Sequence, residues 1–481
     1  MIKKSPLLLA ICGLLIFSSC DDDLDDIIRP ASTLEISDFI YRGLNIWSLY
    51  KADVPELAND FFDTENERLE YLAQFESPEA TFDALISPRD RFSVLRSDYI
   101  ELENALSGIR TSNGMNFSLF IDPTDDTKAF GAVRYVVNDS PADQAGVERG
   151  MLFTMVDGFA LQDPSGSAIT SDTSFIEFFS PETYSISLAT FDDTNGFTLT
   201  GEEIVLNKTE LTINPVHTTK VLNVDGESVG YLHYTSFTNE FDPALNEAFA
   251  QFQNAGVTDL ILDLRYNGGG SVETANDLST MITGQFEGQE FITQQYNADR
   301  NPDNETIRYF NNNLGSSASG ASINSLGLNK VYILTTNRTA SASELIISGL
   351  NPYIEVIQIG TNTTGKFEGS FLLYDAPDFR RANANPNHRY VMLPLTFKSV
   401  NANGLTDYFD GFTPEIEIVE NFRTYGTLGE PGEPLLDAAI NAILNGRSLS
   451  KIYNGEHTPT LFDNEQTEAL YQRMITEPSI E

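Results

Sequence analysis

The stretch DLILDLRYNGGG, residues 259–270, joins a nearly continuous apolar run to a loop of three glycines. An apolar run without alternation is typical of a strand that is buried on both faces, as in a parallel sheet covered by helices. Similar runs recur at residues 331–334 and 354–359, and an amphipathic segment over residues 243–253 precedes the first run. This alternation of strands and helices predicts an α/β domain over residues 206–446.

Three polar loops each follow one of these predicted strands. The first, residues 265–270, can direct successive backbone N–H groups into a cavity, although a plain turn has the same composition. The second, NRTASASELIISGL at residues 337–350, places serines before an apolar helix, where a serine is either a helix cap or a nucleophile. The third contains Lys366, which alone would be a solvated charge. Since sites in open α/β sheets form at the carboxyl ends of strands, these loops together could supply oxyanion donors, a nucleophile and a base.

The histidines offer no competing motif. His217 and His233 lie near the start of the α/β domain, and His388 and His457 lie in polar loops. None of them accompanies a serine motif. The sequence also lacks the ligand spacing of common metal sites, such as H-E-x-x-H or C-x-x-C. We therefore expect no metal and no other cofactor.

DLRYNGGG at residues 263–270, TASASE at 339–344 and TGK at 364–366 form a set of motifs. Together they resemble the C-terminal processing, or tail-specific, family of serine peptidases. GFTPE at residues 411–415 is similar to the closing G-x-x-P-D segment of that family. With a PDZ-like region before the α/β domain, the resemblance covers roughly residues 108–446.

The resemblance implies a catalytic Ser/Lys dyad. Ser341 corresponds to the nucleophile, and Lys366 corresponds to the general base. The oxyanion would be held by the backbone amides of Ala342 and Gly269, with Gly268 as the alternative to Gly269. The function implied is hydrolysis of peptide bonds.

The surroundings of the lysine depart from the family at one position. Many members carry a glutamine four residues after the lysine, whereas this chain has Ser370, which can still accept a hydrogen bond from the lysine. A base must be neutral, and burial lowers a lysine pKa from about 10.4. Glu368 and the net charge of −41 act in the opposite direction. We therefore expect Lys366 in a desolvated site with Glu368 directed away from it, and Ser343 as a local cap or structural partner.

Residues 108–205 change to short β-rich runs separated by Asp and Asn turns, which predicts strands. SPADQAGV at residues 140–147, followed by MVDG at 155–158, predicts a short helix, a strand and an Asp-Gly turn. This pattern resembles the PDZ domains of bacterial proteases, which bind a peptide as an added strand. The peptide-binding loop would then comprise Gly114, Met115, Asn116 and Phe117. A small β domain without a ligand is the alternative.

The two flanking regions carry no chemical motif. Residues 33–107 contain apolar residues at helical spacing, which predicts a small helical domain that acts in packing or as a lid. Residues 447–481 are polar and are expected to form a C-terminal tail.

The first residues indicate export. Residues 1–19 combine two lysines with an apolar run and end in small residues before Cys20, which resembles a bacterial lipoprotein signal peptide with Cys20 as the lipidated residue. The acidic run that follows resembles the surface-export signal of Bacteroidetes lipoproteins. A plain signal peptide is the alternative. Residues 20–32 are rich in aspartate and would form an acidic tether. The predicted signal and Cys20 lead us to expect a protein of the cell envelope that is held by a lipid anchor. A net charge of −41 argues against nucleic acid as a partner.

These observations predict a multidomain α+β protein with a small N-terminal helical domain, a PDZ-like β domain and an α/β catalytic domain of the tail-specific protease type. Its expected activity is that of a serine endopeptidase on exported proteins or peptides, with PDZ-assisted recognition of C-terminal tails. Two alternatives stay open. The chain could be a peptide-binding lipoprotein that has lost turnover, or a binding protein whose glycine loop holds an anion. The sequence does not indicate an oligomeric state.

Overall fold

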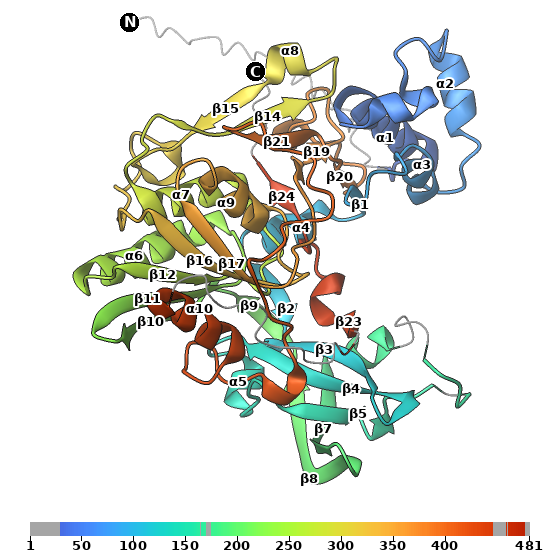
Figure 1. Ribbon diagram of the computed structural model, residues 1–481. Helices are drawn as coiled ribbons and strands as arrows, with labels where there is room; N and C mark the ends of the chain where they lie inside the picture. The colour runs from blue at the N-terminus through green and yellow to red at the C-terminus, as the bar shows by residue number, and fades with distance from the viewer. Residues whose placement is uncertain (1–28, 164, 170–174, 446–457, 459, 477–481) are drawn as a thin grey trace, which may run out of the picture.

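The computed structural model describes residues 29–163, 165–169, 175–445, 458 and 460–476. Figure 1 shows a helical region near the N-terminus, a central sheet with its helices, and a β-rich region at the opposite end. The predicted signal peptide, with Cys20 and most of the acidic tether, lies outside the described residues. Among the described helices, none is long and apolar enough to span a membrane. The predicted domain limits stay predictions.

A six-stranded sheet forms the centre of the predicted α/β region. Its strands run in the order β10 (Val216–Val224), β11 (Glu227–Tyr234), β12 (Asp259–Asp263), β16 (Lys330–Thr335), β17 (Glu355–Gly360) and β22 (Ile416–Glu417). β10 is antiparallel to β11, and the pairings from β11 to β22 are parallel. This arrangement confirms the α/β prediction.

Helices cover both faces of this sheet (Figure 1). α6 (Asp242–Asn254), α7 (Val272–Thr283) and α9 (Ala342–Leu350) pack with Leu260 and Leu262 of β12. α10 (Pro434–Asn445) packs on the other face with Ile261. Neighbouring residues of β12 therefore enter two different cores, which is why its sequence is apolar without alternation.

The N-terminal helices are α1 (Thr33–Trp47), α2 (Glu65–Leu72), α3 (Pro78–Ala84) and α4 (Tyr99–Leu106). The first three share the core of the central region, and α4 packs in a separate cluster with β19 (Leu373–Tyr374) and β20 (Val391–Leu393). The side chains of α1 that face the core, such as Phe39 and Leu44, belong to the same apolar cluster as α6 and α7. β1 (Val94–Arg96) also pairs with β20, which pairs with β19. The helical region is thus continuous with the central region.

A smaller four-stranded sheet lies beside the helices. It consists of β15 (Thr306–Tyr309), β14 (Glu290–Tyr296), β21 (Phe397–Asn401) and β18 (Glu368–Gly369), and α8 (Asn301–Asn304) joins β14 to β15. β18 begins two residues after Lys366, so this sheet fixes the chain beyond the lysine.

The region predicted to resemble a PDZ domain forms a twisted antiparallel sheet. Its strands include β3 (Met115–Asp122), β4 (Asp125–Val136), β5 (Leu152–Val156), β6 (Phe159–Ala160), β7 (Thr183–Asp192) and β8 (Gly196–Asn207), and β2 (Ile109–Ser112) pairs with β9 (Thr209–Thr212) beside it. The helix α5 (Pro141–Gln144) begins after Ser140, whose side chain accepts a hydrogen bond from the Asp143 amide. The helix, the strand and the Asp157-Gly158 turn therefore lie where the sequence predicts them.

The C-terminal segment differs from the expected polar tail. β23 (Thr460–Asp463) pairs with β3, and β24 (Met474–Ile475) pairs with β13 (Gly270–Ser271) of the glycine loop. Phe462, Met474 and Ile475 are buried, each in a different apolar cluster. These apolar residues are too few and too widely spaced to produce a periodic pattern, so the sequence alone does not predict that the segment packs.

Candidate active site

The three predicted loops meet at one end of the central sheet. The Ser343 hydroxyl donates to the Asn267 carbonyl at 3.0 Å, so the serine loop is tied to the glycine loop. The Thr364 amide donates to the Thr339 carbonyl at 3.0 Å, so the lysine loop is tied to the serine loop. A Cβ atom at Gly269, where φ is +111°, would lie 2.6 Å from Ser341 Cβ. Only glycine allows the backbone to approach the serine this closely.

Ser341 has a backbone conformation that is rare for a non-glycine residue. Its φ is 67° and its ψ is −118°, and the side chain is fully buried. The Oγ atom has no hydrogen-bond partner among the described residues. The hydroxyl is therefore not committed to capping α9. Strained residues of this kind cluster at functional sites, and the N-terminus of α9 favours negative charge beside it.

Lys366 lies in the desolvated site that a lysine base needs. It is fully buried, and its Nζ atom lies 4.8 Å from the centre of the Phe92 ring. Burial lowers the pKa of Lys366 to about 7, while the carboxylate of Glu368 opposes this change and Arg473 adds to it. Nζ donates to the Glu368 carbonyl at 2.8 Å, so in this structure it is not bonded to Ser341.

Glu344 joins the serine and lysine loops. Its Oε2 atom accepts the amides of Ser341 at 2.9 Å and Lys366 at 2.8 Å. Its Oε1 atom accepts the Gly365 amide at 2.7 Å and the Thr363 hydroxyl at 2.6 Å. Burial raises the pKa of Glu344 to about 7. Sequence reasoning did not assign this role, although a glutamate three residues after a helix-capping position is a known signal for contact with that residue's amide.

Replacing Glu344 with glutamine should lower kcat for peptide hydrolysis by roughly 10- to 100-fold, because the amide group presents N–H to donors that need an acceptor. KM should change little, since Glu344 lies beneath the loops. Steady-state kinetics and thermal unfolding of Glu344→Gln would test this. Glu415→Gln is the matched control, because Glu415 is exposed and accepts one backbone amide, that of Gln358. An unchanged kcat would show that Glu344 does not position the dyad.

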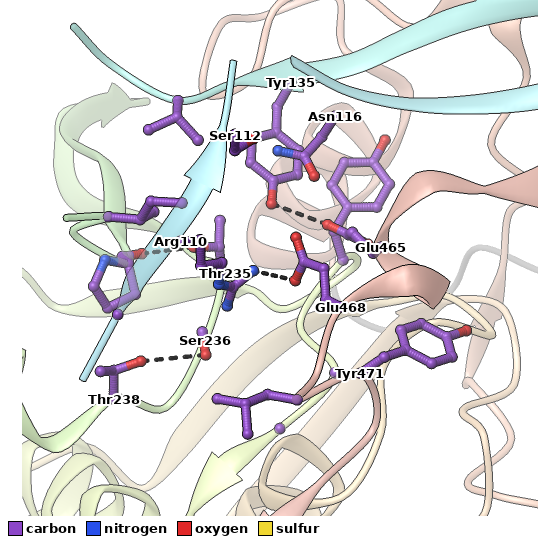
Figure 2. Close-up of a pocket in the computed structure, with 18 of the residues that line it drawn as sticks. Arg110, Ser112, Asn116, Tyr135, Thr235, Ser236, Thr238, Glu465, Glu468 and Tyr471 are labelled. Carbon is purple, nitrogen blue, oxygen red and sulfur yellow. Dashed lines mark hydrogen bonds and ion pairs between the residues drawn. The ribbon is translucent and has the colours of Figure 1, made fainter. Parts of the chain in front are cut away.

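The predicted oxyanion donors are only partly available in this structure. Ala342 opens α9, and first-turn amides have no acceptor within a helix. The Gly269 amide, however, donates to Asn267 Oδ1 at 2.9 Å. Gly268 and Gly269 line a cavity of about 50 Å³ between the glycine loop and the β-rich region (Figure 2). The glycine loop therefore borders a polar cavity, as expected, but one of its donors is already bonded.

Two further observations concern the lysine. The N-terminal region supplies Phe92, and Arg91 donates to the Gly365 carbonyl at 2.6 Å. The Tyr50 hydroxyl donates to the carboxylate of Glu368, which holds that side chain toward the N-terminal region. The helical region thus covers the lysine loop, which its sequence, without any chemical motif, could not indicate.

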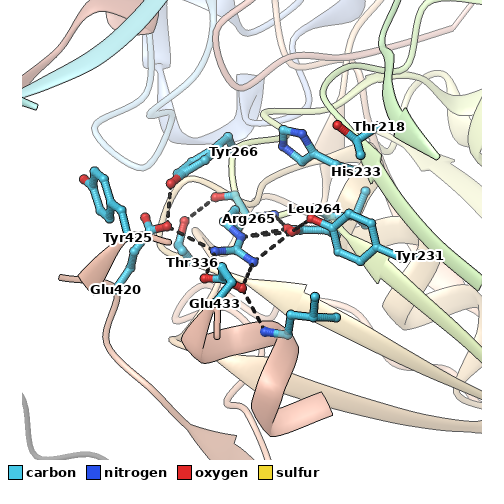
Figure 3. Close-up of polar contacts among 12 residues, drawn as sticks. Thr218, Tyr231, His233, Leu264, Arg265, Tyr266, Thr336, Glu420, Tyr425 and Glu433 are labelled. Carbon is cyan, nitrogen blue, oxygen red and sulfur yellow. Dashed lines mark hydrogen bonds and ion pairs between the residues drawn. The ribbon is translucent and has the colours of Figure 1, made fainter. Parts of the chain in front are cut away.

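The glycine loop begins on a buried ionic network (Figure 3). Arg265 contacts Asp263 at 2.8 Å, Glu433 at 2.6 Å and Glu420 at 3.2 Å. The Tyr231 hydroxyl also donates to Asp263 at 2.7 Å. The network ties the end of β12 to the segment that leads into α10, and so fixes where the glycine loop starts.

The other predicted residues lie apart from the dyad or contact it through the backbone. Ser370 pairs with β24, because its amide donates to the Met474 carbonyl at 2.8 Å. His217 and His233 contact each other at 3.1 Å rather than Ser341. Residues 114–117 lie at the start of β3, beside a pocket of about 450 Å³ that Met115 and Phe117 help to line.

Comparison with known proteins agrees with this geometry. Residues 228–373 match the model of peptidase family S41, and residues 35–94 match the S41 N-terminal domain. The chain is 26% identical over 235 residues to a chloroplastic C-terminal processing peptidase of Tetradesmus obliquus, which covers 47% of this chain and 46% of the relative. It is 23% identical over 228 residues to a carboxyl-terminal-processing protease of Synechocystis, covering 47% of each. The chain spans about half the length of these curated relatives.

A crystal structure from Bacteroides fragilis, assigned by its name to the S41 proteases, has a TM-score of 0.67 and 28% identity, and covers 84% of this chain and 97% of that one. The fold and the three loops thus define a multidomain α/β protein with a peptidase-type catalytic domain. The chain carries both domain types of peptidase family S41, and its resemblance to C-terminal processing peptidases is confirmed.

Proposed function

We propose that this protein is a serine endopeptidase that uses Ser341 and Lys366 as a catalytic dyad. The observation that supports this most directly is the link through Glu344. One carboxylate oxygen accepts the amides of both residues, next to a buried lysine with a pKa of about 7. A lysine with that pKa is largely neutral at slightly alkaline pH, as a general base requires.

In the proposed mechanism, neutral Lys366 turns from the Glu368 carbonyl to Ser341 and accepts the hydroxyl proton. The Ser341 oxygen then attacks the carbonyl carbon of the substrate. The Ala342 amide and an amide of the glycine loop hold the oxyanion, and Gly269 must exchange its bond to Asn267 to take part. When the C–N bond breaks, Lys366 gives its proton to the departing amine. Water, deprotonated by the same lysine, then releases the acyl group from Ser341.

We also propose that the β-rich region binds peptide substrates in the manner of a PDZ domain. Met115, Asn116 and Phe117 begin β3, and the pocket beside them is lined by apolar side chains, such as Met115 and Phe117, together with polar ones. This is the combination that holds an added strand and its side chains. Substrates would be exported proteins or peptides, and attachment to the cell envelope through Cys20 is part of the same proposal.

The test uses unfolded casein and two versions of one peptide, with a free and an amidated C-terminus. The proposal expects cleavage of casein and faster cleavage of the peptide with the free carboxylate. Equal cleavage rates for the two peptides would contradict the proposed recognition of C-terminal tails, but they would be consistent with the proposed peptidase activity. The peptides could also bind without being cleaved, both by the parent and by a variant in which the C-terminal segment binds the rest of the chain less tightly. That result would favour the peptide-binding alternative.

A further inference from the structure

The C-terminal segment, Thr460–Thr476, follows the path that a peptide substrate would take. β23 adds to β3 as an antiparallel strand, with Phe462 opposite Leu119. The next residue after β23, Asn464, continues the contact through its side chain. It accepts the Phe117 amide at 2.8 Å and donates to the Met115 carbonyl at 3.3 Å. The segment therefore occupies the edge where the sequence predicts peptide binding.

The same segment then reaches the predicted active site, and its path from the edge of β3 to the glycine loop is named the peptide groove. β24 lies between the glycine loop and Ser370, with Met474 opposite Gly270. A Cβ atom at Gly269 would lie 2.7 Å from the Arg473 carbonyl oxygen and 2.7 Å from Ser341 Oγ. The Arg473 carbonyl and the Ser341 hydroxyl therefore meet over the same face of Gly269.

Acidic side chains of the segment pair with arginines along this path. Asp463 accepts two hydrogen bonds of 2.9 Å from Arg338, which lies in the serine loop. Glu465 lies 3.1 Å from Arg134, and its other oxygen accepts the Tyr135 hydroxyl at 3.0 Å (Figure 2). Glu468 pairs with Arg110. In a chain with a net charge of −41, this succession of arginines is a local basic path.

Within the residues that the structure describes, the surroundings of Arg473 include an unpartnered polar atom and an unusual backbone conformation, which are not expected of a segment that only completes the fold. Arg473 is half-buried, its cation acts on Lys366, and its Nε atom has no hydrogen-bond partner among the described residues. Gln472 has a φ of 50°, which is unusual for a non-glycine residue. Lys366 also points to Glu368, and the Gly269 amide is bonded to Asn267, so the docked segment is not held for attack.

We propose that the peptide groove takes extended acidic peptides and that Thr460–Thr476 is a built-in ligand of this class, which blocks the groove until a substrate or another event displaces it. The claim that the segment inhibits catalysis rests on the proposed peptidase function. The claim that the groove binds acidic peptides does not depend on that function. Because the segment is tethered, it competes with free peptides at an effective concentration in the millimolar range.

The test weakens the segment in the full chain without touching the dyad or the groove. The triple variant Asp463→Asn, Glu465→Gln, Glu468→Gln leaves the arginines without their carboxylate partners in the docked state, whereas the arginines meet water when the segment leaves. The control triple, Glu202→Gln, Glu203→Gln and Glu247→Gln, removes the same charge from exposed positions. Circular dichroism would verify that both variants are folded.

Binding is measured first, in the Ser341→Ala background, with a fluorescent peptide of residues 460–476. The peptide should bind the triple variant at least about tenfold more tightly than it binds the parent or the control triple. A peptide with the same three acidic residues neutralised should bind at least about tenfold more weakly. Equal binding to parent and triple variant, or equal binding of the two peptides, would overturn the inference whatever the catalytic activity.

Hydrolysis of casein is measured second, with Ser341 intact. The triple variant should be at least about tenfold faster than the parent, and the acidic peptide should inhibit it. Tighter peptide binding with no hydrolysis in any variant would support the built-in ligand and refute the proposed peptidase. If the triple variant does not fold, Glu468→Gln alone is the milder substitution, and it should shift both measurements in the same direction.

Discussion

Replacing Lys366 with methionine should lower kcat/KM for peptide hydrolysis by roughly 10³-fold or more, because methionine fills the same buried space without a group that accepts a proton. The site around it should survive, since within the described part of the chain Lys366 Nζ makes one backbone hydrogen bond, to Glu368. Ser341→Ala should abolish hydrolysis to at least the same extent, and the two substitutions together should cost little more than either alone. These losses of kcat/KM would be measured most clearly by steady-state kinetics in the background of the triple variant Asp463→Asn, Glu465→Gln, Glu468→Gln.

The pH profile provides an independent check on the same residue. Lys366 acts as a base only when it is neutral, so the rate should fall about tenfold per pH unit below its pKa of about 7 and level off above it. The groups whose charges act on Lys366 are Glu368, Arg473, Asp90 and Glu344. Removing the cation of Arg473 should move the midpoint upward, because Arg473 lowers the pKa of Lys366.

Lys398→Met is the matched control, since Lys398 is a partly exposed lysine paired with Asp407 in the same region. It should leave the rate and its pH dependence unchanged. A flat profile from pH 5 to 9, or retained activity in Lys366→Met, would exclude lysine as the base. His217 and His233 would be tested next. The pKa of each lies below its usual value because burial disfavours the charged ring.

Sequence predicted the parts of this protein that depend on local patterns. The continuous apolar run of β12 indicated a buried parallel strand, and the structure places it between two cores. The three loops were predicted to meet because the carboxyl ends of parallel strands share one edge of a sheet. The desolvation of Lys366 was expected from the role of general base that the resemblance implies, because a lysine base works only when burial lowers its pKa.

The contacts that sequence could not indicate join residues far apart in the chain. Tyr50 reaches Glu368 and Phe92 reaches Lys366, although the helical region carries no catalytic motif. The C-terminal segment contacts both β3 and the glycine loop, although its sequence is polar and without period. Such contacts follow from packing of distant elements, which composition and periodicity do not encode.

Replacing Arg265 with leucine should destabilise the protein by ~3–5 kcal/mol or prevent folding, because three carboxylates around it would lose their shared cation (Figure 3). Arg265, Asp263 and Glu433 are almost completely buried, so water cannot replace the guanidinium. Urea unfolding followed by circular dichroism would measure the loss. The glycine loop begins at Arg265, so activity should fall together with stability.

The pH dependence of this loss separates a charge effect from a packing effect. In the parent, Arg265 holds the pKa of Glu433 below its usual value against burial, which acts in the opposite direction. The carboxylate therefore stabilises the fold above the unfolded-state pKa and loses that contribution as the pH falls through the lower folded-state pKa. Without Arg265, burial dominates and the folded state takes up the proton more readily than the unfolded state. The deficit of Arg265→Leu should therefore shrink between pH 8 and pH 5.

Arg389→Leu is the appropriate comparison, because Arg389 pairs with Asp98 at 3.1 Å on the surface, with its side chain 62% exposed. An exposed pair contributes at most about 1 kcal/mol. If Arg265→Leu costs no more than Arg389→Leu, or if its cost is the same at pH 5 and pH 8, the network does not hold the loop through charge. The position of Gly269 beside Ser341 would then depend on other contacts of the loop, such as the bond from the Gly269 amide to Asn267.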